Sequence, residues 1–321
     1  MSIGTTAIPD AAVSVTVPAK VNLALCVGAR REDGYHDLAT VFQAVSLFDE
    51  IVALPRSDGQ IVLQMSGEGS EELACDHTNL AYRAALLLRE RAAGGRAPGV
   101  DLRIVKQIPM AGGMAGGSGD AAATLLACNR LWDLGLPIDD LSRLGAELGS
   151  DVSFLLYGGN ALGLGRGERL TPQTATGRLE WVFATAPRGL STPLVYRQFD
   201  DMAARGAIRP NNELAAEALA DLCSGDPERV AGRLRNDLQA AAVELYPQLA
   251  MTLDAGLRAG ALAALVSGSG PTCAFLAADA SSADDLADEL FDKASEVQDV
   301  RRAYGPVAGP SVTTGPDRFS R

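Results

Sequence analysis

The feature that most restricts how this chain can fold is a run of glycines between a strand and a helix. The segment KQIPMAGGMAGGSGDAAATLLACNRLW, residues 106–132, has five glycines between Gly112 and Gly119 and continues as a good helix former. The first N–H groups of a helix lack partners inside it, and glycine lets a backbone approach a ligand closely. We therefore predict a phosphate site formed by residues 109–119 and the helix start. The alternative is a tight packing turn, which needs only one or two glycines.

Two well-known phosphate-binding patterns fit this loop poorly. The G-x-x-x-x-G-K-[ST] pattern is absent, because no lysine follows the last glycine. Residues 117–122 half-match the dinucleotide fingerprint G-x-G-x-x-A, but the first glycine of the match lies well past Pro109. That fingerprint also needs an acidic residue at the end of a second strand, whereas Asp139 and Asp140 stand at a predicted helix start. The loop therefore belongs to neither pattern.

Composition narrows the class of protein. The chain has 321 residues and a formal net charge of -12, with no basic stripe, which argues against a nucleic-acid partner. A phosphate-bearing substrate must therefore be held locally, by backbone amides and a few selected cations. No signal peptide and no membrane-length apolar run is found, so we expect a cytoplasmic protein without a membrane partner. The five cysteines have no C-x-x-C spacing and are expected to be small buried residues: Cys26, Cys75, Cys128, Cys223 and Cys273.

Strand and helix patterns mix without a regular strand–helix–strand order, which favours an α+β fold with two lobes. Residues 13–28 alternate as two short strands separated at Pro18, and residues 78–95 have helical spacing that Gly94 and Gly95 end. Further strands are predicted at 37–54, 61–65, 100–109 and 179–187, and a strand, glycine turn and strand within 261–277. Further helices are predicted at 137–149, between 193 and 259, and at 282–296. We place an N-terminal domain at 1–170, a C-terminal domain at 171–314 and a loose tail at 315–321.

Three segments, in order, resemble the motifs of the GHMP kinases, a family that includes galactokinase, homoserine kinase and mevalonate kinase. They are PAKVNLALCVGARREDGYHDLATVFQAVSLFDE, PMAGGMAGGSGDAAA and VSGSGPTCAFL. The resemblance covers nearly the whole chain and is weakest at residues 197–233 and in the tail. PAKVNL followed by R-x-DGYH, with GSDVSFLLYGGNALGLGRGE, is most similar to members that phosphorylate an alcohol carrying a cytidyl group. It implies an N-terminal nucleotide-binding lobe like ribosomal protein S5 and a C-terminal α/β-sandwich lobe.

The resemblance places ATP, with Mg²⁺, on the glycine loop. The predicted nucleotide-binding residues are Asn79, Lys106, Pro109, Met110, Ala111, Gly112, Gly113, Met114, Ala115, Gly116, Gly117, Ser118 and Gly119. Asn79 is as readily a helix N-cap, and Lys106 as readily a solvated side chain. Relatives carry glycine, glycine, serine and asparagine where this chain has Ala111, Ala115, Gly119 and Asp120. Asp120 would bring negative charge near the phosphates unless it caps the helix or faces away.

Two residues match the catalytic pair of the family, Lys20 and Asp151. Asp151 follows Gly149 and Ser150 and begins an apolar run, so by itself it is equally well read as a helix N-cap. Lys20, in an apolar strand, is either a solvated edge residue or a buried cation with a partner. Next to Asp151, it would keep the acid ionised and neutralise charge on the transferring group. Whether Asp151 removes the hydroxyl proton or only orients the hydroxyl is left open.

A further set of residues is expected to bind the second substrate. By resemblance, Tyr35 and Tyr196 stack on the two faces of a cytosine and His36 hydrogen-bonds to its edge. Asn22 would bind the alcohol, or is a bonded buried amide. The turn formed by Gly268, Ser269 and Gly270 would support the loop or the substrate phosphates, or is simply a tight hairpin.

The predicted partners are therefore a small cytidyl substrate and ATP, with the metal ligands and the oligomeric state left open. A kinase of the homoserine or mevalonate type is the first alternative, and the DGYH segment argues against it because those substrates have no base to stack. A catalytically silent nucleotide-binding protein of the same fold is the second alternative. The presence of both Lys20 and Asp151 argues against that one.

Overall fold

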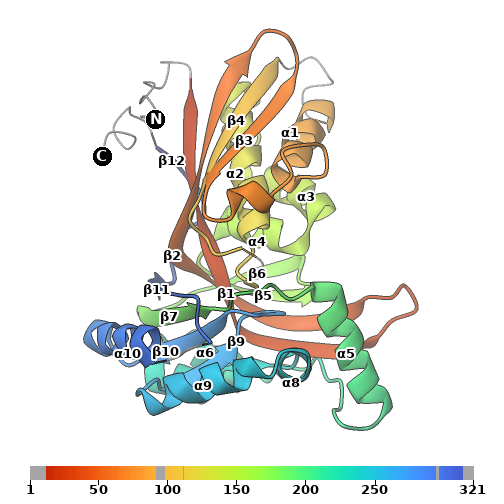
Figure 1. Ribbon diagram of the computed structural model, residues 1–321. Helices are drawn as coiled ribbons and strands as arrows, with labels where there is room; N and C mark the ends of the chain where they lie inside the picture. Colours follow the sequence, from red (N-terminus) through yellow and green to blue (C-terminus); the bar gives the residue numbers. More distant parts are fainter. Residues whose placement is uncertain (1–11, 92–97, 111, 294–295, 314–321) are drawn as a thin grey trace.

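The structure is a computed structural model that describes residues 12–91, 98–110, 112–293 and 296–313. The described chain forms two sheets with helices packed on each, which appear as an upper and a lower lobe in Figure 1. Long strands of the first sheet extend from the upper lobe down to the lower one. The α+β class with two lobes, predicted from the element order, is confirmed.

The first sheet has eight strands, and its central pair is built from two long antiparallel segments. The sheet order is β12–β1–β2–β4–β3, with β5 and β8 pairing with β2 and β1, and β6 pairing with β5. The bounds are β1 Val13–Arg30, β2 His36–Arg56, β3 Ile61–Gly67, β4 Gly99–Lys106, β5 Asn160–Gly165, β6 Arg169–Gln173, β8 Arg235–Asn236 and β12 Ser311–Thr313. The β2–β4 pairing brings the end of β4, where the glycine loop begins, beside residue Glu50 of β2.

The prediction of two short strands separated at Pro18 is wrong. Strand β1 is continuous through Pro18, and its pairing register with β2 shifts between Pro18 and Ala19. Proline has no N–H group to donate, and a register irregularity is a place where a strand accommodates this loss. The bulged strand carries Lys20 directly after the irregularity.

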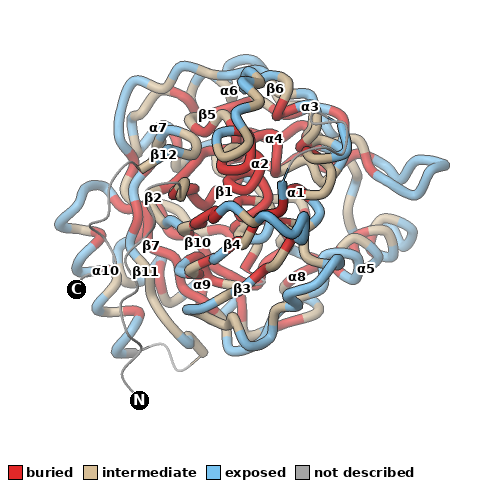
Figure 2. The backbone as a smooth tube through the Cα atoms, turned by 90° about the horizontal axis from the view of Figure 1, so that it is seen from above, coloured by how far each residue is buried: buried red, intermediate tan, exposed pale blue. Residues whose placement is uncertain are grey.

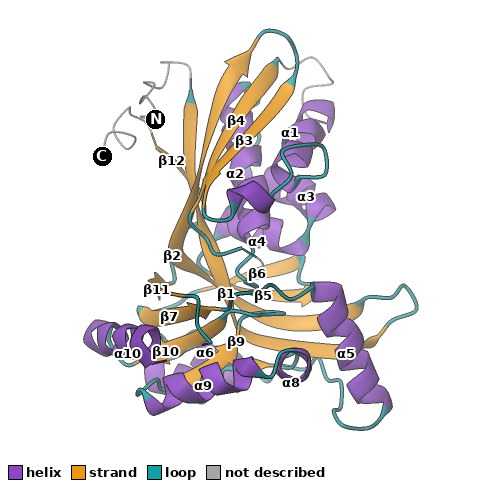
Figure 3. Ribbon diagram, viewed as in Figure 1, coloured by secondary structure: helices purple, strands orange, loops and turns teal. Residues whose placement is uncertain are grey.

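Four helices cover one face of the upper part of this sheet (Figure 3). They are α1 Leu80–Arg91, α2 Gly116–Leu131, α3 Ile138–Leu148 and α4 Ser150–Tyr157, and a short 3₁₀ turn, η1, spans Ser70–Glu72. Helix α2 lies at the centre and buries its alanines against β1 and β2. Figure 2 shows the buried residues gathered around α2, β1 and β2. This packing fixes the start of α2, and with it the glycine loop, against the sheet.

The second sheet has four antiparallel strands in the order β11–β7–β10–β9. Their bounds are β7 Leu179–Thr185, β9 Ala263–Val266, β10 Cys273–Ala277 and β11 Asp299–Gly305. The helices of this half are α5 Thr192–Ala204, α6 Ala216–Leu222, α7 Pro227–Ala231, α8 Gln239–Leu245, α9 Gln248–Arg258 and α10 Ala280–Lys293. Helices α9 and α10 pack against this sheet, with α9 below it and α10 at its left side in Figure 1. Trp181, Phe183 and Phe275 are fully buried in the core of this half.

The predicted domain boundary at residue 170 falls inside β6, and the later strands β8 and β12 return to pair with β1. The boundary therefore stays a prediction, and the predicted tail at 315–321 lies outside the described residues. Four of the five cysteines are buried as expected, whereas Cys75 is exposed. In the described part of the chain, no helix has the length and apolar character needed to cross a membrane.

Candidate active site

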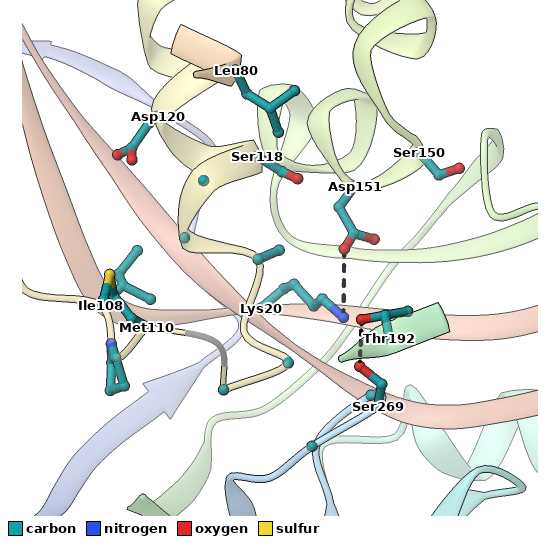
Figure 4. A pocket seen from close by; sticks show the side chains of 18 of the residues that line it. Lys20, Leu80, Ile108, Met110, Ser118, Asp120, Ser150, Asp151, Thr192 and Ser269 are labelled. Atoms are coloured by element: carbon teal, nitrogen blue, oxygen red, sulfur yellow. Dashed lines mark hydrogen bonds and ion pairs between the residues drawn. The ribbon is translucent and has the colours of Figure 1, made fainter. Parts of the chain in front are cut away.

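A cavity of about 700 Å³ lies at the glycine loop, lined by residues from both lobes (Figure 4). The predicted site residues that line it are Lys20, Asn22, Asn79, Lys106, Pro109, Met110, Gly112, Gly113, Ala115, Gly116, Gly117, Ser118, Asp151, Tyr196, Gly268, Ser269 and Gly270. Met114 and Gly119 are buried and do not line it, and Ala111 lies outside the described residues. The fold thus brings most of the predicted nucleotide and catalytic residues to one place.

The start of helix α2 supplies free amide groups to this cavity. The N–H groups of Gly116, Gly117 and Ser118, the first three of the helix, have no hydrogen-bond acceptor among the described residues. A Cβ atom built on Gly117 would meet nothing within 4 Å, so its backbone is open to a ligand. Ala115 precedes the helix with φ 60° and ψ 33°, a left-handed conformation that costs alanine about 1 kcal/mol or more. This geometry suits an anion, since the dipole of α2 also favours negative charge here.

Two other glycines of the loop, Gly112 and Gly113, are required by packing. A Cβ atom on Gly113 would lie 1.9 Å from the carbonyl oxygen of Ser267, and one on Gly112 would lie 2.4 Å from the Thr272 hydroxyl. The Ser267 hydroxyl donates to the Gly113 carbonyl at 3.2 Å. The β9–β10 turn, which contains Gly268–Gly270, therefore supports the loop directly. The alternative of a tight packing turn therefore explains Gly112 and Gly113. The open backbone at Gly117 is instead what a phosphate site requires.

Lys20 and Asp151 face each other across the cavity, as the dashed line in Figure 4 shows. Lys20 Nζ lies 3.7 Å from Asp151 Oδ2, and the Lys20 side chain is 6% exposed while that of Asp151 is 31% exposed. The Lys20 backbone N–H also donates to the Met114 carbonyl at 3.2 Å, which ties β1 to the loop. Asp151 is the second residue of α4, and Gly149 is the N-cap. The reading of Asp151 as an N-cap is therefore wrong, and its carboxylate stays accessible from the cavity.

Asn22 has both ends of its amide occupied by the protein. Its Oδ1 accepts from Lys20 Nζ at 2.6 Å, and its Nδ2 donates to the Thr40 hydroxyl at 2.8 Å. Thr40 in turn donates to the Ala24 carbonyl. This series of hydrogen bonds holds the Lys20 ammonium in place. The geometry therefore matches the alternative in which Asn22 is a buried amide hydrogen-bonded within the protein. Binding of the alcohol by Asn22 remains a prediction.

Lys106 lies in a buried charge cluster that the sequence did not announce. It is 3% exposed, which rules out the solvated alternative, and its Nζ contacts the carboxylates of Asp49 and Asp120. Asp49 also accepts from the N–H groups of Gln107 and Ile108, so it has more hydrogen-bond donors than Asp120. Burial lowers the pKa of Lys106, but the two carboxylates outweigh this effect and raise it.

Asp120 is the excess anion of this cluster. Its Oδ1 is buried without a hydrogen-bond partner, and burial raises its pKa to about 7, with Lys106 opposing the rise and Asp49 adding to it. In Figure 4 its carboxylate points to the opposite side of the helix start from Ser118. The unfavourable charge expected near the phosphates is thus placed against Lys106 instead, although the residue still lines the cavity.

Asn79 serves as a cap and also lines the cavity. Its Oδ1 accepts from the N–H of Ala81 at 2.9 Å, and its Nδ2 donates to the Ala74 carbonyl. The side chain thereby orders the loop that precedes α1. Both interpretations of this residue are compatible with its position, and its contact with a nucleotide stays a prediction.

The aromatic residues predicted to hold a base line a second cavity of about 770 Å³. It shares Arg166, Thr192 and Tyr196, among others, with the first cavity. The His36 and Tyr196 rings lie 5.0 Å apart, and the exposed Tyr35 ring has the Arg166 guanidinium over it at 4.7 Å. Burial raises the pKa of Tyr196, so its hydroxyl stays protonated. Tyr35 and Tyr196 therefore flank one cavity, but Arg166 now covers one face of Tyr35.

Several site residues escaped the sequence reasoning. Asp49 contacts the start of the glycine loop, and Arg166 lies over the Tyr35 ring. Pairing between distant strands brings these groups together, and no local sequence pattern marks either residue. Thr192 bonds to Ser269 at 2.7 Å and joins α5 to the second glycine turn. A serine or threonine before Pro193 is an ordinary helix start, so the only available signal was the STPL sequence itself. Side chains far apart in the sequence meet here because β2, β5 and α5 converge.

The described residues contain no group of three or more histidine, cysteine, aspartate or glutamate side chains that could hold a metal ion. Magnesium is commonly bound by one or two carboxylates together with substrate phosphates and water. The donor set of this cavity therefore does not build a metal site by itself.

Comparison with known proteins shows the class to which this fold and site belong. Residues 79–159 match the family model described as GHMP kinases N terminal domain, and residues 216–296 match GHMP kinases C terminal. The chain belongs to the GHMP kinase family.

Particular relatives are similar over nearly the whole chain. A protein of Mycolicibacterium smegmatis named 4-diphosphocytidyl-2-C-methyl-D-erythritol kinase is 53% identical over 95% of this chain and 93% of that relative. A protein of Streptomyces coelicolor with the same name is 53% identical over 94% of this chain and 99% of its own length. A crystal structure of 4-(cytidine 5'-diphospho)-2C-methyl-D-erythritol kinase matches with a TM-score of 0.71 and 33% identity, covering 94% of this chain and all of that one.

Proposed function

We propose that this protein transfers a phosphoryl group from ATP to the 2-hydroxyl of 4-diphosphocytidyl-2-C-methyl-D-erythritol, a step of the non-mevalonate route to isoprenoid precursors. The observation that carries the proposal is the Lys20–Asp151 pair, 3.7 Å apart, in the cavity that the glycine loop lines. Relatives with this activity in their names share about half of its residues over more than nine tenths of the chain.

The glycine loop is the proposed site of the ATP phosphates. The free amides of Gly116, Gly117 and Ser118 bind phosphate oxygens, and the positive end of α2 adds to this attraction. With a net charge of -12, the protein offers no general positive field, so these local donors must hold the triphosphate. Mg²⁺ is proposed to arrive on the ATP phosphates and supplies neutralisation of their charge when bound.

Asp151 is the proposed partner of the acceptor hydroxyl. Its carboxylate is partly exposed to the cavity and accepts a hydrogen bond from that hydroxyl. The carboxylate thereby either removes the hydroxyl proton or orients the hydroxyl oxygen toward the phosphorus. Lys20, held by Asn22, lies beside that carboxylate and neutralises charge on the transferring group. Positioning and charge stabilisation provide most of the catalysis in phosphoryl transfer, so this small set of residues is sufficient.

The second cavity is the proposed cytidine pocket. It adjoins the Lys20–Asp151 pair through Thr192 and Tyr196, which line both cavities. A substrate with a base at one end and a hydroxyl at the other can therefore reach both sites together. Tyr35 and Tyr196 supply aromatic faces for the base, and His36 a hydrogen-bonding edge.

A substrate panel tests this proposal. ATP consumption is measured with 4-diphosphocytidyl-2-C-methyl-D-erythritol, homoserine and mevalonate side by side under the same conditions. We expect turnover with the cytidyl compound alone. Turnover with homoserine or mevalonate instead would assign another activity of the family, and turnover with none of the three would favour a catalytically silent protein.

A further inference from the structure

The two ring nitrogens of His36 lie in different surroundings. Nε2 lies 2.8 Å from Oδ1 of Asp200, a residue of α5, and Oδ2 of the same carboxylate lies 3.8 Å from Arg30 Nε. An ionised carboxylate only accepts hydrogen bonds, so the hydrogen of a neutral His36 ring must be on Nε2. Nδ1 is then a bare acceptor.

Nδ1 of His36 is left for a ligand. It has no hydrogen-bond partner among the described residues, and it is not one of the polar atoms sealed away from solvent without a partner. His36 lines the second cavity, and its ring is held in place by Tyr196 at 5.0 Å and by the edge of Phe199 at 6.0 Å. A fixed ring that belongs to the cavity lining and has one acceptor without a protein partner selects for a ligand edge that donates.

We propose that Asp200 is a positioning residue that sets the tautomer of His36 and so makes the pocket accept cytosine and reject uracil. The inference rests on the proposed function, because it concerns the base pocket of that same site. Cytosine presents an amino group at position 4, which donates to Nδ1, whereas uracil presents an oxygen there, which repels it. A site built to pair with a donor discriminates strongly, because a mismatched base leaves buried polar groups unpaired.

Binding of CDP and UDP, measured by isothermal titration calorimetry, tests the assignment without relying on turnover. We expect the wild type to bind CDP roughly 10- to 100-fold more tightly than UDP. In Asp200→Asn, the side-chain amide can turn either its oxygen or its NH₂ group to Nε2, so both tautomers of His36 become accessible. The ratio of the two dissociation constants should then fall by about tenfold. Asp200→Glu keeps an acceptor-only group and should retain most of the preference.

Asp201→Asn is the matched control, because Asp201 is an exposed neighbour on α5 and its loss makes the same change in charge. Its ratio should equal that of the wild type. An unchanged CDP-to-UDP ratio in Asp200→Asn, in protein with a wild-type circular dichroism spectrum, would overturn the role of Asp200 alone. Failure of the wild type to bind CDP at all would overturn the base pocket itself, and this inference with it.

Discussion

Lys106 Nζ lies 2.7 Å from Asp120 Oδ2, beneath the first turn of the helix that follows the glycine loop. The pair joins β4 to α2, and Asp49 of β2 completes the cluster. One ammonium group can neutralise only one of two carboxylates, and Asp49 already holds two backbone N–H donors. The remaining negative charge falls on Asp120, which has a buried oxygen without a partner. The floor of the proposed nucleotide site therefore contains a group that titrates near neutral pH.

This arrangement predicts how Asp120→Asn changes stability with pH. Burial raises the pKa of Asp120 to about 7 from its ordinary value of 3.8. Between pH 3.8 and about 7, the folded protein therefore binds a proton that the unfolded protein does not. The carboxyl thus favours folding at low pH, and this contribution is lost as pH rises to about 7. Asparagine does not ionise, so the variant does not lose this stability as pH rises. The unfolding free energy of the variant relative to the wild type should rise by up to about 4 kcal/mol between pH 4 and pH 8.

Urea unfolding of both proteins at a series of pH values measures this difference. Because all other titrating groups are common to the two proteins, the difference isolates position 120. Parallel stability curves for wild type and variant would contradict the assignment of the excess charge to Asp120.

Asp151→Asn should nearly abolish turnover. The amide keeps the shape of the side chain but cannot take a proton or stay paired as an anion with Lys20, and we expect kcat to fall by roughly 100- to 10,000-fold. ATP affinity should change little, because the phosphates are proposed to lie on backbone amides. Steady-state kinetics and nucleotide titration report the two quantities separately. Asp140→Asn, at a half-buried aspartate of α3 that lines neither cavity, is the control, and a wild-type kcat in Asp151→Asn would remove Asp151 from the mechanism.

Tyr35→Ala should raise KM for the cytidyl substrate more than KM for ATP. Stacking of a base on an aromatic ring contributes on the order of 1–3 kcal/mol, which corresponds to a rise of roughly 5- to 150-fold. Tyr304 offers a matched control, since it is also an exposed tyrosine with an arginine over its ring, and it lines neither cavity. An equal rise in both KM values for Tyr35→Ala would place Tyr35 outside the base pocket.

Ala115→Gly should stabilise the protein. Ala115 has φ 60°, a region in which alanine is strained and glycine is not, although glycine loses more entropy on folding. The expected net gain in unfolding free energy is about 0.5–1 kcal/mol. The same change at Ala220, an exposed residue within helix α6, should instead cost about 1 kcal/mol. Urea denaturation of both variants gives the comparison, and a loss of stability in Ala115→Gly would mean that the left-handed conformation is not populated.

The sequence predicted the residues of the site better than it predicted the course of the strands. Local patterns predicted the helix after the glycine loop, the α+β class and, through resemblance, the family. The same patterns divided β1 at Pro18, because a proline with alternating neighbours has the same signature at a strand end as at an irregularity within a long strand. A pattern of single residues carries no information about which strand lies alongside.

Pairs of distant side chains were the least predictable part. Lys106 reads as a solvated lysine at a strand end, and only the pairing of β4 with β2 shows that Asp49 buries it. No local sequence pattern marks Asp200 as functional, and its bond to His36 exists because α5 packs beside the start of β2.

By itself, the sequence determined the features that depend on the local backbone: the glycines that leave the amides at the start of α2 open to a ligand, and the periodicity that makes α2 a helix. Only the tertiary structure decided how the charged and polar groups are paired, namely which carboxylates contact Lys106, which nitrogen of His36 faces Asp200, and how close Lys20 lies to Asp151. The physical reason is that backbone preferences depend on neighbours along the chain. Charge and hydrogen-bond states depend on burial and on partners in space, and these are supplied by residues from other elements of the fold.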